Sequence, residues 1–127
     1  MKWFAAILCC LAGPVAAKSP APDWYVEANV HHDIARLLAE NCDELEFHHG
    51  GYDRHVLEIM GRLSDMQING ARPDFAPTSE FRKHRHTDAF LAKHGLLPDS
   101  PLRAFCAAGK AEREARTPIG LMLRLPR

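Results

Sequence analysis

The chain has 127 residues, with 16 basic, 16 acidic and 8 histidine side chains, so its formal net charge at pH 7 is zero. This balance argues against a nucleic-acid partner, because binding to phosphates depends on clustered positive charge. Hydrophobic residues make up 46% of the sequence, which suits one small globular domain. We therefore expect a single folded unit without internal repeats.

Residues 1–17 are typical of an export signal. Lys2 gives a positive start, residues 3–12 form a short apolar run, and Val15 to Ala17 offer small side chains before a cleavage site after Ala17. The run is well short of the ~20 apolar residues that span a bilayer. No later stretch is long enough to span a membrane, so we expect a periplasmic or secreted product with no integral membrane segment.

Cleavage would leave two of the four cysteines, Cys42 and Cys106. Outside the cytoplasm two remaining cysteines most often pair, which predicts a Cys42–Cys106 disulfide. In the loop-entropy model a crosslink over so long a loop contributes roughly 4 kcal/mol to stability. The alternative is a pair of free thiols that bind a metal or carry out redox chemistry, although the chain has no Cys-x-x-Cys motif.

The first helix follows a predicted flexible leader over residues 18–27, and we expect the folded domain to span residues 28–127. Asp23 or Asn29 suits the cap of this helix. Gly50-Gly51 is predicted to end it, because glycine is common just past a helix C-terminus. Apolar residues recur along it at helical spacing. They are Val30, Ile34, Leu37, Leu38, Cys42 and Leu45.

A second helix is predicted over residues 52–68, with Asn69-Gly70 as its stop. Its apolar positions again recur every three or four residues. They are Val56, Ile59, Met60, Leu63 and Met66. Residues 71–77 contain two prolines and are predicted to form a loop, because proline cannot continue a helix.

Two more helices and a short turn complete the predicted fold. Thr78 or Ser79 would cap a third helix over residues 80–94. Ser100-Pro101 marks the start of the fourth, and Thr117-Pro118 repeats this cap-plus-proline pattern at a final turn. The inner face of the fourth helix is predicted to hold Leu102, Phe105, Cys106 and Gly109. No segment alternates with the period of a strand, so we expect an all-α fold, a small orthogonal bundle of four main helices plus a short C-terminal helical turn.

Three pieces of sequence carry a family resemblance. They are Asn41-Cys42, the signature Phe105-Cys106-Ala107-Ala108-Gly109-Lys110-Ala111-Glu112, and the ending Thr117 to Arg124 with Ile119-Gly120 inside it. Together with the export signal, this order resembles a family of small exported alphaproteobacterial proteins described only as a domain of unknown function. The resemblance covers most of the mature chain. It implies a helical, disulfide-linked fold, and it brings no activity, substrate or catalytic residue.

The eight histidines are candidates for metal binding, since neutral imidazoles bind zinc, copper and nickel. No two histidines have the spacing of three or four residues that places two ligands on one helix face. A site would therefore have to form between elements, and the best candidate is His48, His49 and His55 around the Gly50-Gly51 turn, with Asp53 as a carboxylate ligand. Solvated surface histidines are the simpler alternative, and no other cofactor is expected.

Charge is unevenly distributed along the chain. Residues 18–60 hold 9 acidic and 3 basic side chains, whereas residues 61–127 hold 7 acidic and 12 basic ones. Arg82, Lys83 and Arg85 lie in the first turns of the third helix, where the helix dipole disfavours each cation by up to about 1 kcal/mol. Pairing with the acidic face of the first helix is one explanation. The other is an anionic partner, such as anionic lipid or an acidic envelope protein.

Catalysis finds little support in the sequence. Ser64 and Ser79 lie in no nucleophile-elbow context. Glu112 and Arg116 are four residues apart, which predicts an ordinary ion pair along one helix. We expect no enzyme, but a periplasmic interaction or structural module whose partner is an unknown envelope protein. The alternatives are a histidine-dependent metal-binding protein and a pH-responsive envelope protein that resembles an acid-stress chaperone.

Overall fold

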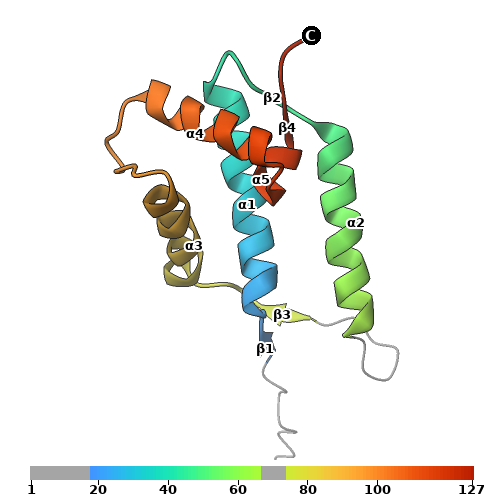
Figure 1. Ribbon diagram of the computed structural model, residues 1–127. Coiled ribbons are helices and arrows are strands. Elements are labelled where there is room, and N and C mark those ends of the chain that lie inside the picture. Colours follow the sequence, from blue (N-terminus) through green and yellow to red (C-terminus); the bar gives the residue numbers. More distant parts are fainter. Residues whose placement is uncertain (1–17, 67–73) are drawn as a thin grey trace, which may run out of the picture.

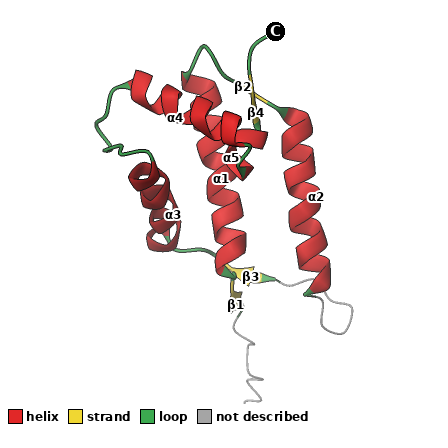
Figure 2. Ribbon diagram, viewed as in Figure 1, coloured by secondary structure: helices red, strands yellow, loops and turns green. Residues whose placement is uncertain are grey.

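The computed structural model describes residues 18–66 and 74–127, and this part of the chain is mostly helical, as the sequence predicts (Figures 1 and 2). The central helix is α1 (Asp23–Asn41), which contacts all the other helices. These are α2 (His49–Asp65), α3 (Glu80–Lys93), α4 (Leu102–Ala115) and the one-turn α5 (Pro118–Leu121). In Figure 1, α2 and α3 run roughly alongside α1 and α4 lies across it. The predicted signal at 1–17 and the predicted helix stop at Asn69-Gly70 lie outside the described residues.

The N-terminal segment joins the fold earlier than the predicted boundary at residue 28. The strand β1 (Ser19–Pro20) pairs in parallel with β3 (Phe75–Ala76), and α1 begins at Asp23. Ala21 and Val26 are buried in the core, which ties this segment to the rest of the molecule. The stretch over 18–27 predicted as a flexible leader therefore contains a strand and the first turn of the central helix.

The chain between α1 and α2 also differs from the prediction. The helix α1 ends at Asn41, with Cys42 as its cap residue, and β2 (Glu46–Phe47) then pairs antiparallel with β4 (Leu123–Arg124). Gly50-Gly51 does not end a helix but lies in the first turn of α2. A Cβ atom at Gly51 would overlap the backbone carbonyl of Leu121, so glycine is required there by a close approach of two backbones.

Hydroxyl caps fix the starts of α3 and α5, as the sequence predicts. The Ser79 hydroxyl accepts a hydrogen bond from the backbone N–H of Arg82 at 3.3 Å. The Thr117 hydroxyl accepts one from the backbone N–H of Gly120 at 3.1 Å, with Pro118 in the first helical position. Each cap satisfies one of the backbone donors that a helix N-terminus leaves without an intrahelical partner.

The start and the orientation of α4 differ from the prediction. Pro101 is the cap residue, and the Ser100 hydroxyl instead accepts from the backbone N–H of Leu97 at 2.9 Å. Leu102, predicted on the inner face, is 54% exposed. The buried positions of the helix are Ala108, Gly109 and Glu112. Glu112 is the charged one of these three residues, so its carboxylate lies in the interior of the protein.

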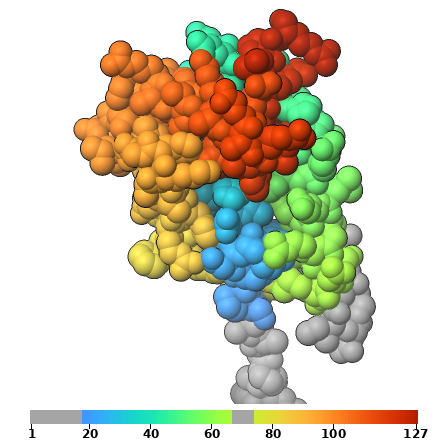
Figure 3. Space-filling view, in the orientation of Figure 1, coloured from blue at the N-terminus to red at the C-terminus, as the bar shows by residue number. Residues whose placement is uncertain are grey.

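One core, built around α1, holds the helices together. The predicted Cys42–Cys106 disulfide is present and joins the end of α1 to α4, with 5.6 Å between the two Cα atoms. In Figure 3, α3 and α4 cover much of α1, and its first turns are visible between α3 and α2. The buried apolar side chains include Val26, Val30, Ile34, Ala35, Leu38, Leu45, Phe90, Leu96, Ala108, Ile119, Met122 and Leu123. Across residues 18–66 and 74–127, no helix combines the length and the apolar character needed to cross a membrane.

Candidate functional site

A polar cavity of about 310 Å³ opens between α1, α3 and the junction of α4 with α5. Its lining combines acidic, basic and imidazole side chains with a few apolar ones. The lining residues are Glu27, His31, His86, Ala89, Phe90, Lys93, Glu112, Thr117, Pro118 and Ile119. Such a mixture of groups can hold a cation or exchange protons.

Glu112 lines this cavity and is only 2% exposed. Lys93 Nζ and His94 Nε2 each lie 2.7 Å from Glu112 Oε1, and the Thr117 hydroxyl donates to Oε2. These partners come from the end of α3 and the start of α5. The predicted helix-supporting pair with Arg116 is therefore wrong. Arg116 ends α4 in the left-handed conformation at φ 54°, and it is exposed.

Two pKa shifts follow from this arrangement. Burial by itself raises the pKa of a carboxyl group, but hydrogen bonds from Lys93, Thr117 and His94 outweigh it and hold the pKa of Glu112 below its usual range. Burial lowers the pKa of His31; the carboxylate of Glu27 opposes this shift and the imidazole of His55 adds to it. At neutral pH the cavity therefore holds an ionised Glu112 and a mainly neutral His31.

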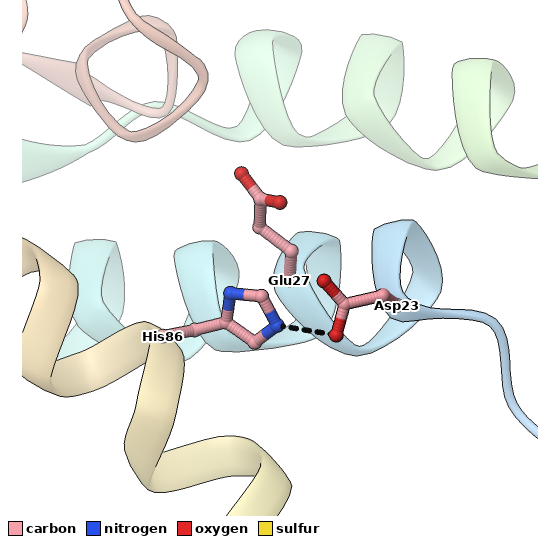
Figure 4. Close-up of side chains that lie close together, drawn as sticks. All are labelled: Asp23, Glu27 and His86. Atoms are coloured by element: carbon pink, nitrogen blue, oxygen red, sulfur yellow. Dashed lines mark hydrogen bonds and ion pairs between the residues drawn. The ribbon is translucent and has the colours of Figure 1, made fainter.

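A second group of titratable side chains lies at the N-terminal end of α1. Asp23, Glu27 and His86 each offer one ligand atom, and these three atoms lie within 4.8 Å of one another. Figure 4 shows the imidazole of His86 reaching from α3 to Asp23, with Glu27 one turn further along α1. Glu27 also lines the polar cavity, together with His31 and His86. Within residues 18–66 and 74–127 it is the one such group of three.

The structure does not bring together the predicted ligands around Gly50-Gly51. His48 Nδ1 lies 3.4 Å from the carbonyl oxygen of Leu121, and His55 donates from Nε2 to the carbonyl of Ala28 on α1 at 3.0 Å. His49 and Asp53 are exposed. The physical reason is that His48 at the helix cap and His55 on α2 face different neighbours, Leu121 and Ala28, whereas His49 and Asp53 share another, exposed face of α2. Metal binding by this set stays a prediction.

Two of the three predicted partner-binding cations are paired with α1. Arg85 Nη2 lies 2.6 Å from Asp23 Oδ1, and Arg82 Nη2 lies 3.9 Å from the same oxygen. Lys83 pairs with Glu80 at 3.2 Å within α3. The acidic side of α1 therefore compensates the positive charge at the start of α3, the first of the two predicted explanations. An anionic partner for this surface stays a prediction.

An apolar groove of about 270 Å³ lies between α1, α3 and α4, beside the disulfide. Nearly all of its lining side chains are apolar, with Asn41 and Thr87 as the polar ones. The lining residues are Ile34, Leu37, Leu38, Asn41, Cys42, Thr87, Phe90, Leu91, Leu102 and Phe105. Leu37 is 59% exposed and Leu102 is 54% exposed, so a substantial apolar surface of the groove faces solvent.

The sequence predicted the disulfide but not the polar residues on α1. The cysteine pairing was predicted and is confirmed, so neither Cys42 nor Cys106 is a free thiol. The polar residues on α1 were missed, although Asp23, Glu27 and His31 are spaced four residues apart and so share one helix face. A comparison of the histidines alone does not reveal this series, because it mixes two carboxylates with one imidazole.

Comparison of the chain with models of protein families, with curated proteins and with solved structures finds no match. The functional argument therefore rests on the groups described above.

Proposed function

We propose that this chain is a small exported protein, periplasmic or secreted, that acts without catalysis as an interaction module. Its apolar groove would hold apolar side chains of a partner protein in the envelope. The observation that supports this is the groove itself, which is almost wholly apolar and leaves Leu37 and Leu102 more than half exposed. A disulfide beside the groove suits a compartment outside the cytoplasm. Membership of the small exported alphaproteobacterial family is part of this proposal and adds no activity to it.

The size of the groove favours a protein partner over a small molecule. Its volume of about 270 Å³ lies below the roughly 300–1,000 Å³ usual for small-molecule sites. Covering Leu37 and Leu102 would contribute about 1 kcal/mol each, because roughly half of each side chain is already buried. Side chains of the partner that fill the groove between these leucines must supply the rest, as anchor residues do at protein interfaces.

Site-specific crosslinking in the native host tests this proposal. A photo-activated side chain at Leu37 or at Leu102 should capture the same protein from the envelope, because both positions line one groove. Leu57 provides the matched control. It is a leucine on α2 that is 72% exposed and does not line the groove.

The pattern over the three positions decides the result. Capture of one common protein from Leu37 and Leu102, and not from Leu57, supports the groove as the binding surface. Capture of the same proteins from all three positions would reflect nonspecific contact with an exposed apolar residue and would contradict the proposal. So would different proteins from Leu37 and from Leu102.

An acid-responsive form of this function is the second candidate, and it follows from the position of Glu112. This carboxylate links α3 to α4, and these two helices form walls of the groove together with α1. Protonation of Glu112 would weaken the link and allow the groove to widen. Hydrogen bonding lowers the pKa of Glu112 in the folded protein below 4.5, the usual value for glutamate. An acid-responsive function therefore requires that the groove widens at a pH below 4.5. An acid-stress chaperone would use such an opening to bind unfolding proteins.

A further inference from the structure

One face of α1 carries a series of potential metal ligands over three successive turns. Asp23, Glu27 and His31 are spaced four residues apart, and His86 of α3 lies against the first two of them. His86 is only 10% exposed, whereas the two carboxylates are about half exposed. The group therefore combines a nearly buried imidazole with two carboxylates that reach solvent. An ion can enter the group from the side of the carboxylates.

The distances fit a shared ion. His86 Nε2 lies 3.1 Å from Asp23 Oδ1, and the ligand atoms of Asp23, Glu27 and His86 all lie within 4.8 Å of one another. Two ligand atoms bound to one zinc ion at 2.0–2.1 Å stand about 3.3 Å apart in tetrahedral geometry. The pair formed by Asp23 and His86 is therefore already at a suitable separation, and the Glu27 carboxylate would have to move closer to complete three ligands.

We infer that Asp23, Glu27 and His86 form a binding site for a divalent transition-metal ion, zinc above all. The ligand set combines carboxylate oxygens with an imidazole nitrogen, which suits zinc better than a soft ion that prefers sulfur ligands. Calcium is a poorer fit, since it takes six to eight oxygen ligands and this group offers two carboxylates. Two ionised carboxylates also balance the charge of one divalent ion.

The fourth coordination position of such a site would face the polar cavity. Glu27 and His86 both line that cavity, and so does His31, whose Nε2 lies 3.6 Å from Glu27 Oε1. Zinc sites with three protein ligands and one open position are the kind that bind water or a further ligand. His31 is placed to orient the Glu27 carboxylate as a neighbour of the site.

Arg85 is the competitor of the metal ion. Its guanidinium lies 2.6 Å from Asp23 Oδ1, the oxygen that also faces His86. The Arg85 side chain is 64% exposed, so it can turn into solvent when an ion takes its place. Within the described part of the chain, the hydrogen bonds and ion pairs of Asp23 all use Oδ1, so Arg85 and an ion held between Asp23 and His86 would use the same oxygen. Removal of Arg85 should therefore strengthen metal binding, whereas a purely structural ion pair predicts no such effect.

Calorimetric titration with Zn²⁺ tests this site on the mature protein with its disulfide intact and without a histidine tag. We expect one site per chain whose affinity falls at least about tenfold in Glu27→Gln and in His86→Ala, since even the loss of an outer partner of a metal site costs 10–100-fold. Arg85→Ala should bind Zn²⁺ more tightly than the wild type. Mg²⁺ and Ca²⁺ should not compete at millimolar concentration.

Matched variants keep the result decisive. His49→Ala and Asp53→Asn change exposed candidate ligands on α2 and should leave the affinity unchanged. Glu27→Gln preserves the size of a half-exposed side chain, so it decides the question even where His86→Ala disturbs folding. Equal Zn²⁺ affinities of the wild type and Glu27→Gln would overturn the site. Loss of binding in His49→Ala, or weaker binding in Arg85→Ala, would overturn it as well.

Discussion

At the scale of single residues, Glu112 joins three helices at one point. Lys93 and His94 approach its carboxylate from the end of α3, and Thr117 does so from the start of α5. His31 of α1 lines the same cavity, and the Glu112 carboxylate acts to raise the pKa of this histidine against the effect of its burial. A buried charge that loses its partners is strongly destabilising, so this network constrains how α3, α4 and α5 meet. The network was not predictable from the sequence, because Arg116 lies four residues after Glu112 and so is the expected local partner. In the structure Arg116 adopts the left-handed conformation that ends α4, and it does not pair with Glu112.

Glu112→Gln tests this network through its pH dependence. The substitution removes the charge and keeps the shape, and we expect the free energy of unfolding at pH 7 to fall by about 1–3 kcal/mol. The pKa of Glu112 is lowered in the folded state, so its stabilisation is complete above the usual value of 4.5 and is lost as the pH falls through the folded-state pKa. The difference between variant and wild type should therefore shrink toward about pH 3. Urea unfolding at the two pH values measures it.

Glu114→Gln is the control for that substitution, because Glu114 lies on the same helix and is exposed. It should change the unfolding free energy little at either pH. A loss in Glu112→Gln that is equally large at pH 7 and pH 3 would contradict the assignment of the effect to the ionised carboxylate. If the acid-responsive function holds, Glu112→Gln should also bind an apolar dye at neutral pH.

At the scale of elements, the backbone of α5 lies close to the backbones of α2 and α4. A Cβ atom at Gly120 would overlap the backbone carbonyl of Glu112, and one at Gly51 would overlap that of Leu121. Helical spacing and cap signals predicted α2, α3 and α4 to within about three residues, whereas the first helix was expected to run to Gly50-Gly51 and ends at Asn41. The four strands found among the described residues have two residues each and so carry no periodic signal. The position of Gly50-Gly51 in the first turn of α2 was also not predictable, because a glycine pair is equally typical of a helix end and of a close approach between two backbones.

Two glycine-to-alanine substitutions separate close approach from helix propensity. Gly120→Ala should lower the free energy of unfolding by about 1–3 kcal/mol or more, because the added methyl group forces α5 away from α4. Gly61→Ala on α2 should raise it by up to about 1 kcal/mol, since a Cβ atom there meets no atom within 4 Å and alanine favours a helix. Thermal or urea unfolding compares them. An equal effect of both substitutions would contradict the packing at α5.

At the scale of the whole molecule, the two halves of α1 contribute to the two candidate sites. Its N-terminal half carries Asp23 and Glu27 beside the polar cavity, and its C-terminal half forms a wall of the apolar groove up to Cys42. The disulfide fixes that end of α1 to α4 across 64 residues of sequence, which contributes roughly 4 kcal/mol in the loop-entropy model. The disulfide was predictable from two cysteines. The groove was not, because it depends on how three helices pack against one another.

The affinity of the crosslinked partner for substituted forms of the groove tests the central claim most directly. Leu102→Lys places a charge on an apolar wall, while Leu57→Lys places the same charge on α2 outside the groove. The dissociation constant, measured with purified partner, should rise at least about tenfold for Leu102→Lys, which corresponds to 1.4 kcal/mol, and should stay unchanged for Leu57→Lys. Equal dissociation constants for the wild type and Leu102→Lys would contradict the groove as the binding surface.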